Sequence, residues 1–216
     1  MNKENNIILG ILFMTLAMFC LSVNDVLVKG LSSAYPIWEV IFFRALSGFI
    51  ISVVLVVVFG WQKLKTKKPL GHLIRAFSAV ACVVFYFFGL KHLMLSENVA
   101  IVHSAPILAT LLAIPILGEK LGLHRIVAVV LGFIGVLIIV KPGSDLFKIE
   151  SLFPLAAAFF MAVGYLSTRF LMSTESSVAI IFYYSLALLI TSFIFFPNNF
   201  VMPSLFNLIP LMSLGI

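Results

Sequence analysis

Long apolar stretches limit what this chain can fold into more than any other feature of its sequence. A helix that crosses a hydrocarbon layer about 30 Å thick needs roughly 20 mostly apolar residues, because each residue adds about 1.5 Å. Seven stretches meet this requirement and an eighth meets it in part. They lie approximately at residues 7–28, 37–59, 72–90, 98–116, 125–140, 151–171 and 178–196, with the partial one at 203–216. We expect the chain to stop within that last helix.

The composition excludes the alternatives to a membrane protein. Apolar residues fill 62% of the 216 positions and charged residues only 10%, and the mean hydropathy is +1.21. Soluble domains hold about 25% charged residues, and disordered chains are far less apolar. Cys20 and Cys82 stand apart, so neither a disulfide framework nor a cysteine metal site is expected. The predicted fold class is therefore an all-α, polytopic transmembrane helix bundle of about eight spans, with connections too short for a soluble domain.

The positions of Lys and Arg predict the orientation, since positive residues are retained on the cytoplasmic side. With the N-terminus cytoplasmic, nine fall on inner segments: Lys3, Lys63, Lys65, Lys67, Lys68, Arg75, Lys120, Arg125 and Arg169. Four fall on outer segments: Lys29, Lys91, Lys141 and Lys148. We interpret the basic loop at 61–75 as a topology anchor, with lipid-headgroup binding as the alternative. The basic residues are too few and too scattered to indicate a nucleic-acid partner.

An internal repeat relates the first two spans to the sixth and seventh. Residues 17–31 align without gaps to residues 157–171, and the same offset of 140 carries residues 41–46 onto residues 181–186. Two successive spans in one register favour duplication over chance. Because the repeated unit contains five spans, its second copy enters the membrane from the opposite side. The sequence therefore predicts an inverted repeat, the architecture of many secondary transporters, which hold substrate near the midplane.

Several ionisable residues lie at membrane depth, where they are costly and are candidates for function. Asn24 and Asp25 are placed near the outer end of the first span, and Arg44 lies about 10 Å into the second. His103 is placed in the outer third of the fourth span. These residues share a depth, so we expect Asp25, Arg44 and His103 to converge with Glu39 in one cavity.

Each of these residues also has a purely structural interpretation. Asp25 and Lys29 are four residues apart and could form a surface pair worth only tenths of a kcal/mol. Arg44 could pair with Asp25 or Glu39, or extend to the outer surface. His103 could be a histidine whose hydrogen bonds are satisfied in the core. Glu97 and Glu119 flank spans, where solvation is the expected state.

Tyrosines within the spans carry a hydroxyl that needs a partner. Tyr86 lies in the third span, while Tyr165 and Tyr184 occupy the repeat positions of Asp25 and Arg44. The two halves of the predicted site are thus chemically unequal, although packing is the commoner role for such tyrosines. Pro106 in the fourth span removes a backbone donor, which suits either a break that lines a substrate path or a simple kink.

The chain contains no sequence pattern of an enzyme. HExxH, GxSxG, GxGxxG and Walker A patterns are absent from the sequence, and the four histidines are too scattered to propose a metal site. We therefore expect neither catalysis, nor a cofactor, nor a metal ion, nor ATP as a direct energy source.

The sequence from residue 97 to residue 143 resembles the EamA family of the drug/metabolite transporter superfamily. The residues that carry this resemblance are Pro106, Gly118, Glu119, Gly132, Gly135, Pro142 and Gly143, together with VNDVLVKGL, the Phe42-Phe43-Arg44 triplet and LKHL at 90–93. Within the family, the sequence looks closest to the S-adenosylmethionine uptake transporters. The resemblance implies a complete first repeat at 7–143 and the start of a second at 151–216, in a ten-span architecture.

The resemblance implies a carrier of the bacterial inner membrane that moves a small organic metabolite by rocking one repeat against the other. As a hypothesis, Arg44 binds a substrate carboxylate or phosphate, Asp25 compensates its charge, and Asn24, Tyr86 and His103 line the pocket. The metabolite would be S-adenosylmethionine or an amino-acid-like compound. The alternative is a truncated, non-transporting subunit that needs a partner half. A homodimer or a complementary half would then join the lipid bilayer as a partner.

Overall fold

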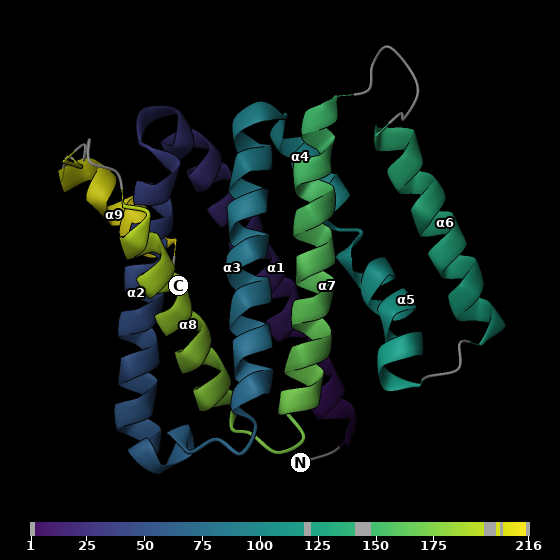
Figure 1. Cartoon of the computed structure of the whole chain (residues 1–216), viewed down its shortest axis with the longest axis horizontal. Coiled ribbons are helices and arrows are strands. Elements are labelled where there is room, and N and C mark those ends of the chain that lie inside the picture. Colours follow the sequence, from purple (N-terminus) through teal and green to yellow (C-terminus); the bar gives the residue numbers. More distant parts are fainter. Residues whose placement is uncertain (1–2, 119–121, 141–147, 197–201, 204, 215–216) are drawn as a thin grey trace.

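The computed structural model describes residues 3–118, 122–140, 148–196, 202–203 and 205–214, and it is helical throughout its ordered elements (Figure 1). The α-helices are α1 (Lys3–Ala34), α2 (Ile37–Phe59), α3 (Pro69–His92), α4 (Leu95–Val102), α5 (Ala105–Leu117), α6 (Leu123–Val140), α7 (Leu152–Leu171), α8 (Ser177–Ile194) and α9 (Leu205–Ser213). Two short 3₁₀ helices, η1 (Trp61–Leu64) and η2 (Ile149–Ser151), precede α3 and α7.

Seven helical segments of the described chain are long and apolar enough to cross a membrane. The span predicted at 37–59 coincides with α2, and the others agree with the helices to within a few residues. The predicted eighth segment is represented by α9, whose nine residues are too short to cross a bilayer. The all-α, multi-pass fold class is therefore confirmed.

The fourth span is broken rather than continuous. Helix α4 ends at Val102, and α5 starts at Ala105 after a turn formed by His103 and Ser104. Pro106 has no N–H to offer to the carbonyl of Val102, and a proline ring disfavours a helix that continues through it. Of the two outcomes that Pro106 allowed, the structure therefore shows a break in the helix rather than a simple kink.

Helix α3 stands beside α7 in the middle of the bundle, and α2 packs against α8 (Figure 1). Gly89 allows α3, α4 and α7 to approach closely, because a Cβ there would lie 2.0 Å from Asn98 Oδ1 and 3.2 Å from Pro154 Cδ. The main apolar core joins α1, α2 and α3 through buried side chains such as Val28, Ile41 and Phe87.

The helices run in the directions that an inverted repeat requires. Helices α7 and α8 run opposite to α1 and α2, to which the offset of 140 relates them (Figure 1). The boundaries 7–143 and 151–216 stay a prediction, and residues 141–147 and 215–216, with Pro142 and Gly143 among them, lie outside the described residues, as does Glu119.

Candidate functional site

Four of the five predicted site residues meet in one cluster between α1, α2 and α3. Arg44 donates from Nη1 to Asn24 Oδ1 at 3.2 Å, and Tyr86 donates its hydroxyl proton to Asp25 Oδ1 at 2.5 Å. All four side chains are half-buried, and Tyr86 lies within electrostatic range of Arg44. We call Asn24, Asp25, Arg44 and Tyr86 the first cluster. The Asn24 amide also donates to the carbonyl of Leu214 at 2.8 Å, so the chain just after α9 contacts this cluster.

The partners inside the first cluster differ from those that either structural interpretation proposed. Arg44 bonds to the Asn24 amide and to neither carboxylate, while Asp25 bonds to Tyr86 and forms no ion pair with Lys29. Lys29 instead donates to the carbonyls of Leu90 and Leu93, at 2.9 Å for Leu93, where α3 ends. An ammonium at a helix C-terminus satisfies carbonyls that have no partner within the helix. Lys29 therefore fastens α1 to α3 one turn beyond Asp25.

Among the described residues, neither His103 nor Glu39 forms a hydrogen bond or ion pair with the first cluster. His103 is exposed in the turn between α4 and α5, where its Nδ1 lies 2.8 Å from the carbonyl oxygen of Val99. Glu39 is fully buried in the first turn of α2. Of the predicted convergence, Asp25 and Arg44 lie in one cluster, which Asn24 and Tyr86 complete. A pocket role for His103 stays a prediction.

Arg75 is an interior cation that the sequence reasoning assigned to a loop. It lies six residues inside α3, where its Nε donates to Thr168 Oγ1 of α7 at 2.6 Å. Its guanidinium carbon lies 5.2 Å from the ring centroid of Tyr184 of α8, a cation–π contact. We call Arg75, Thr168 and Tyr184 the second cluster. No local sequence signal places Arg75 in the interior, because its partners lie on α7 and α8.

Both clusters share one face of α3. Arg75 and Tyr86 are 11 residues apart, which is about three helical turns, so their side chains leave the helix in nearly the same direction. Cys82 lies between them and is within electrostatic range of both Arg44 and Arg75. Helix α3 therefore presents one polar stripe that connects the two clusters through the bundle.

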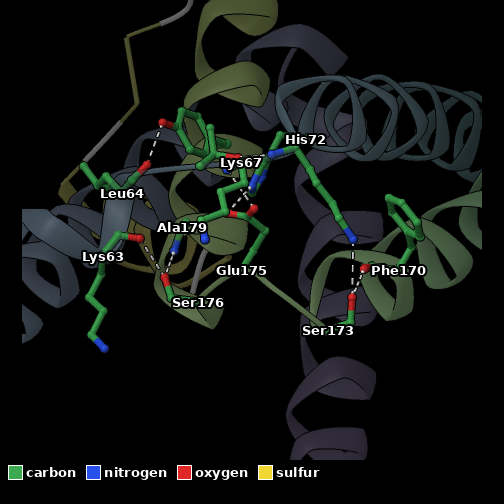
Figure 2. A network of polar contacts seen from close by, with 12 residues as sticks. Lys63, Leu64, Lys67, His72, Phe170, Ser173, Glu175, Ser176 and Ala179 are labelled. Atoms are coloured by element: carbon green, nitrogen blue, oxygen red, sulfur yellow. Dashed lines mark hydrogen bonds and ion pairs between the residues drawn. The ribbon is translucent and has the colours of Figure 1, made fainter.

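Two loops contact each other on the side of the bundle where α1 begins (Figures 1 and 2). We call this side the N-terminal side. The loop after α2 and the loop after α7 meet at Glu175, whose side chain is 1% exposed. The Lys67 N–H donates to Glu175 Oε1 at 2.9 Å, and His72 Nε2 lies 3.6 Å from Glu175 Oε2. The hydrogen bond from Lys67 is the main cause that lowers the pKa of Glu175 below its ordinary value, and burial opposes it.

Further contacts join the same two loops. Ser176 donates its hydroxyl to the carbonyl of Lys63 at 2.8 Å and accepts the N–H of Ala179 at 3.1 Å, so it also caps α8. Tyr183 donates to the carbonyl of Leu64 at 3.0 Å, and Lys68 Nζ lies 3.9 Å from the centroid of the Phe170 ring. We call the contacts of residues 63–68 and His72 with residues 170–183 the loop latch (Figure 2).

A separate cavity of about 410 Å³ lies between α5, α6 and α7. Its polar lining includes Thr110, Arg125, Tyr165 and Arg169, and both arginines also make interactions with other groups. Among the residues that the structure describes, no three His, Cys, Asp or Glu side chains gather as a metal site would require.

A multi-pass helix bundle that holds ionisable side chains together at membrane depth is typical of membrane transporters. The EamA-like transporter family matches residues 8–141, and the chain belongs to this family. The predicted family is thereby confirmed, and so is the expectation of a transporter rather than an enzyme. The chain is a multi-pass membrane transporter of small metabolites.

Relatives of known function are transporters with different cargoes. The S-adenosylmethionine uptake transporter of Rickettsia bellii is 30% identical over 208 residues, which cover 96% of this chain and 71% of the relative. The riboflavin transporter of Vibrio cholerae is 37% identical over 133 residues, covering 61% and 44%. The pseudopaline exporter of Pseudomonas aeruginosa is 28% identical over 198 residues, covering 90% and 69%.

A solved crystal structure of another protein has the same arrangement of helices. Its TM-score to this chain is 0.64 at 19% identity, and the match covers 93% of this chain and 74% of that one. At this identity the likeness concerns the fold alone.

Proposed function

We propose that this chain is a secondary transporter that takes a small, carboxylate-bearing metabolite across the bacterial inner membrane by alternating access. The observation that carries the proposal is Arg44, a half-buried guanidinium in α2 held at membrane depth by the Asn24 amide beside Asp25. A guanidinium offers five N–H donors in a geometry that matches a carboxylate. The N-terminus is cytoplasmic in this proposal, supported by the basic loop at 61–68.

S-adenosylmethionine, or an amino-acid-like compound, is the substrate class that suits the first cluster. Such a molecule carries an α-carboxylate and an α-ammonium, and S-adenosylmethionine adds a sulfonium cation. Arg44 would bind the carboxylate, whereas Asp25, oriented by Tyr86, would compensate positive charge. The uptake transporter of Rickettsia bellii, named for this substrate, supports the same class.

The loop latch supports alternating access. A carrier that opens first on one side and then on the other must close each side with contacts that can be broken. The latch joins a loop of the first repeat to a loop of the second through hydrogen bonds, which can break and form again. In this proposal the structure is closed on the N-terminal side, and opening separates Glu175 from Lys67 and His72.

Uptake of radiolabelled S-adenosylmethionine by the full-length protein in proteoliposomes tests the proposal. We expect Arg44→Ala and Asp25→Ala to abolish most uptake while the protein is still inserted. Glu97→Ala is the matched control, because Glu97 pairs with Lys148 at the surface. Unchanged uptake in both site variants would show that the site is wrong. Uptake of riboflavin in place of S-adenosylmethionine would show that the substrate class is wrong.

The alternative to a chain that transports alone is a chain that needs a partner, either a second copy of itself or a complementary half. The chain covers 71% of the length of the Rickettsia bellii relative. Crosslinking in native membranes measures this directly: a stable complex without which no flux occurs would favour the non-transporting subunit, and flux by an isolated monomer would exclude it.

A further inference from the structure

The repeat gives three residues of the first cluster, Asn24, Asp25 and Arg44, a counterpart in the second half of the chain. The offset of 140 places Gly164 opposite Asn24, Tyr165 opposite Asp25, and Tyr184 opposite Arg44. None of these three counterparts carries a charge at neutral pH. At these three positions the second half therefore has no counterpart of the Arg44 cation.

Arg75 of α3 fills this position from the first repeat. Its guanidinium carbon lies 5.2 Å from the ring centroid of Tyr184. A Cβ built on Gly164 would lie 3.5 Å from Arg75 Nη1 and 3.5 Å from Ser78 Oγ. Because glycine has no side chain, the guanidinium occupies the room where a larger residue at the counterpart of Asn24 would extend.

The side chain of Arg75 points into the bundle and away from the nearest membrane surface. Its Nε bonds to Thr168, three residues before the end of α7, on the N-terminal side. Its Nη1, farther along the side chain, faces Gly164, seven residues or about 10 Å before that end. A basic residue that only anchors the helix would extend toward the headgroups instead. The direction of Arg75 therefore indicates an interior role.

The guanidinium retains hydrogen-bonding capacity in this position. Within the described part of the chain, its one side-chain hydrogen bond goes to Thr168, and the ring of Tyr184 lies 5.2 Å from its guanidinium carbon. No carboxylate of the described residues lies within ion-pair distance of it. A ring face attracts a cation but leaves its N–H donors unused. Cationic side chains that face the interior of a transmembrane bundle typically mark the path of a substrate or an ion.

We propose that Arg75, Thr168 and Tyr184 form a second anion-binding position, which takes a carboxylate or phosphate group of the transported metabolite on the N-terminal side. This rests on the proposed function. His72 of the loop latch lies one turn before Arg75 on α3, so the position lies directly behind the latch. Arg44 and Arg75 then bind the same anionic group in the two access states, one at each end of the polar stripe of α3.

Transport kinetics measured separately from each side of the membrane test whether Arg44 and Arg75 bind the anionic group in different access states. Radiolabelled S-adenosylmethionine is presented to right-side-out and inside-out vesicles that contain the full-length protein. We expect Arg75→Gln to raise KM at least tenfold from the N-terminal side and to change it less than twofold from the opposite side. Arg44→Gln should give the reverse pattern. Equal effects of Arg75→Gln on both sides, or none on either, would overturn the inference.

Two further variants keep the test decisive if Arg75→Gln fails to insert. Arg75→Lys keeps the charge and should raise KM from the N-terminal side by only about threefold, because an ammonium lacks the planar fork. Thr168→Val removes only the hydrogen bond that orients Nε, and should act on the same side to a similar extent. A loss of insertion in all three variants would assign Arg75 to folding and reject the binding position.

A chemical test does not depend on transport. Phenylglyoxal labels accessible guanidinium groups, and peptide mass spectrometry locates the label. Arg75 should be labelled in the wild-type protein, and acetate or inorganic phosphate should slow this labelling at least threefold, whereas chloride should not. Protection by none of these anions would reject the binding position. Protection without any transport would reject the proposed function alone.

Discussion

The first and second clusters hold an arginine inside the bundle in different ways. Arg44 bonds to an amide beside a carboxylate, within a group drawn from α1, α2 and α3. Arg75 bonds to a threonine hydroxyl and rests against a tyrosine ring of the second repeat. The difference teaches that two helix pairs related by the predicted repeat differ in chemistry. The pair α1 and α2 holds its own arginine, whereas the pair α7 and α8 contacts an arginine from α3.

The largest effect that distinguishes the two clusters is expected for Arg44→Ala. Truncating one member of a buried, hydrogen-bonded charge site costs about 2–5 kcal/mol, because the groups around it lose their partner. The kcat/KM of uptake should therefore fall at least about 100-fold, which corresponds to about 2.7 kcal/mol. The measurement is initial-rate uptake at matched protein content. Arg44→Lys should recover part of this loss, and a loss below threefold in Arg44→Ala would break the comparison.

The next effect is expected for Gly164→Leu, which fills the space beside Arg75. A leucine side chain would displace the guanidinium, and overpacking of this kind costs about 1–3 kcal/mol. KM measured from the N-terminal side should rise about tenfold. Gly164→Ala is the matched control, because its Cβ would make ordinary contact at 3.5 Å and should leave KM unchanged. Equal effects of alanine and leucine would show that Arg75 does not need this space.

A smaller effect is expected for Tyr86→Phe in the first cluster. The substitution removes the hydrogen bond to Asp25 and leaves the ring, and one such bond to a charged group contributes about 1.5 kcal/mol. Uptake should fall roughly tenfold or less, measured as kcat/KM. Tyr165→Phe is the matched control at the repeat position of Asp25, since no hydrogen bond of its hydroxyl is found among the described residues. A larger effect of Tyr165→Phe would reverse the ranking of the clusters.

The smallest effect is expected for Glu175→Gln in the loop latch, beside the second cluster. The variant weakens the acceptor of the Lys67 N–H, so hydrogen exchange in residues 61–68 should quicken by roughly threefold. Glu97→Gln, at the surface pair with Lys148, should leave that exchange unchanged. Exchange equal to the wild type would show that Glu175 does not hold the loop.

The pH dependence of the latch follows from the same carboxylate. Its hydrogen bonds lower the pKa of Glu175 below the ordinary value of 4.5, so the folded state favours the ionised form. The contribution of Glu175 to closure is therefore present above that ordinary value and is lost as the pH falls through the lowered pKa. Between about pH 5 and 8 we therefore expect Glu175 to cause no change in the hydrogen exchange of the Lys67 amide.

The sequence predicts the fold well because a bilayer demands long apolar helices, and hydropathy measures that demand directly. It also predicts four members of the first cluster, since depth along a span follows from residue counting. The exposure of His103 was not predicted, because the break at Pro106 places this residue in a turn between two helices. Its role in a pocket stays a prediction. Residue counting cannot show where such a turn directs a side chain.

Arg75 was missed for a related reason. Its neighbours in sequence are the lysines of the loop interpreted as a topology anchor, so charge counting placed Arg75 in the same loop. Only the direction of its side chain, set by Thr168 and by the empty space at Gly164, shows that it belongs to the interior. Both partners are about 90 residues away in sequence, and no local pattern predicts such a contact.

The attachment of Lys29 to the end of α3 helps to define which part of α1 is constrained in its amino-acid sequence. Among the positions whose burial the structure gives, the lower half of α1 exposes its large apolar side chains, Leu9, Ile11, Leu12, Phe13, Leu16 and Phe19 among them, as lipid-facing surface does. The specific contacts gather in its upper third, at Asn24, Asp25, Val28 and Lys29. In a saturation mutagenesis experiment, one short stripe of α1 should therefore tolerate almost nothing, while the rest of the helix accepts nearly any apolar substitution.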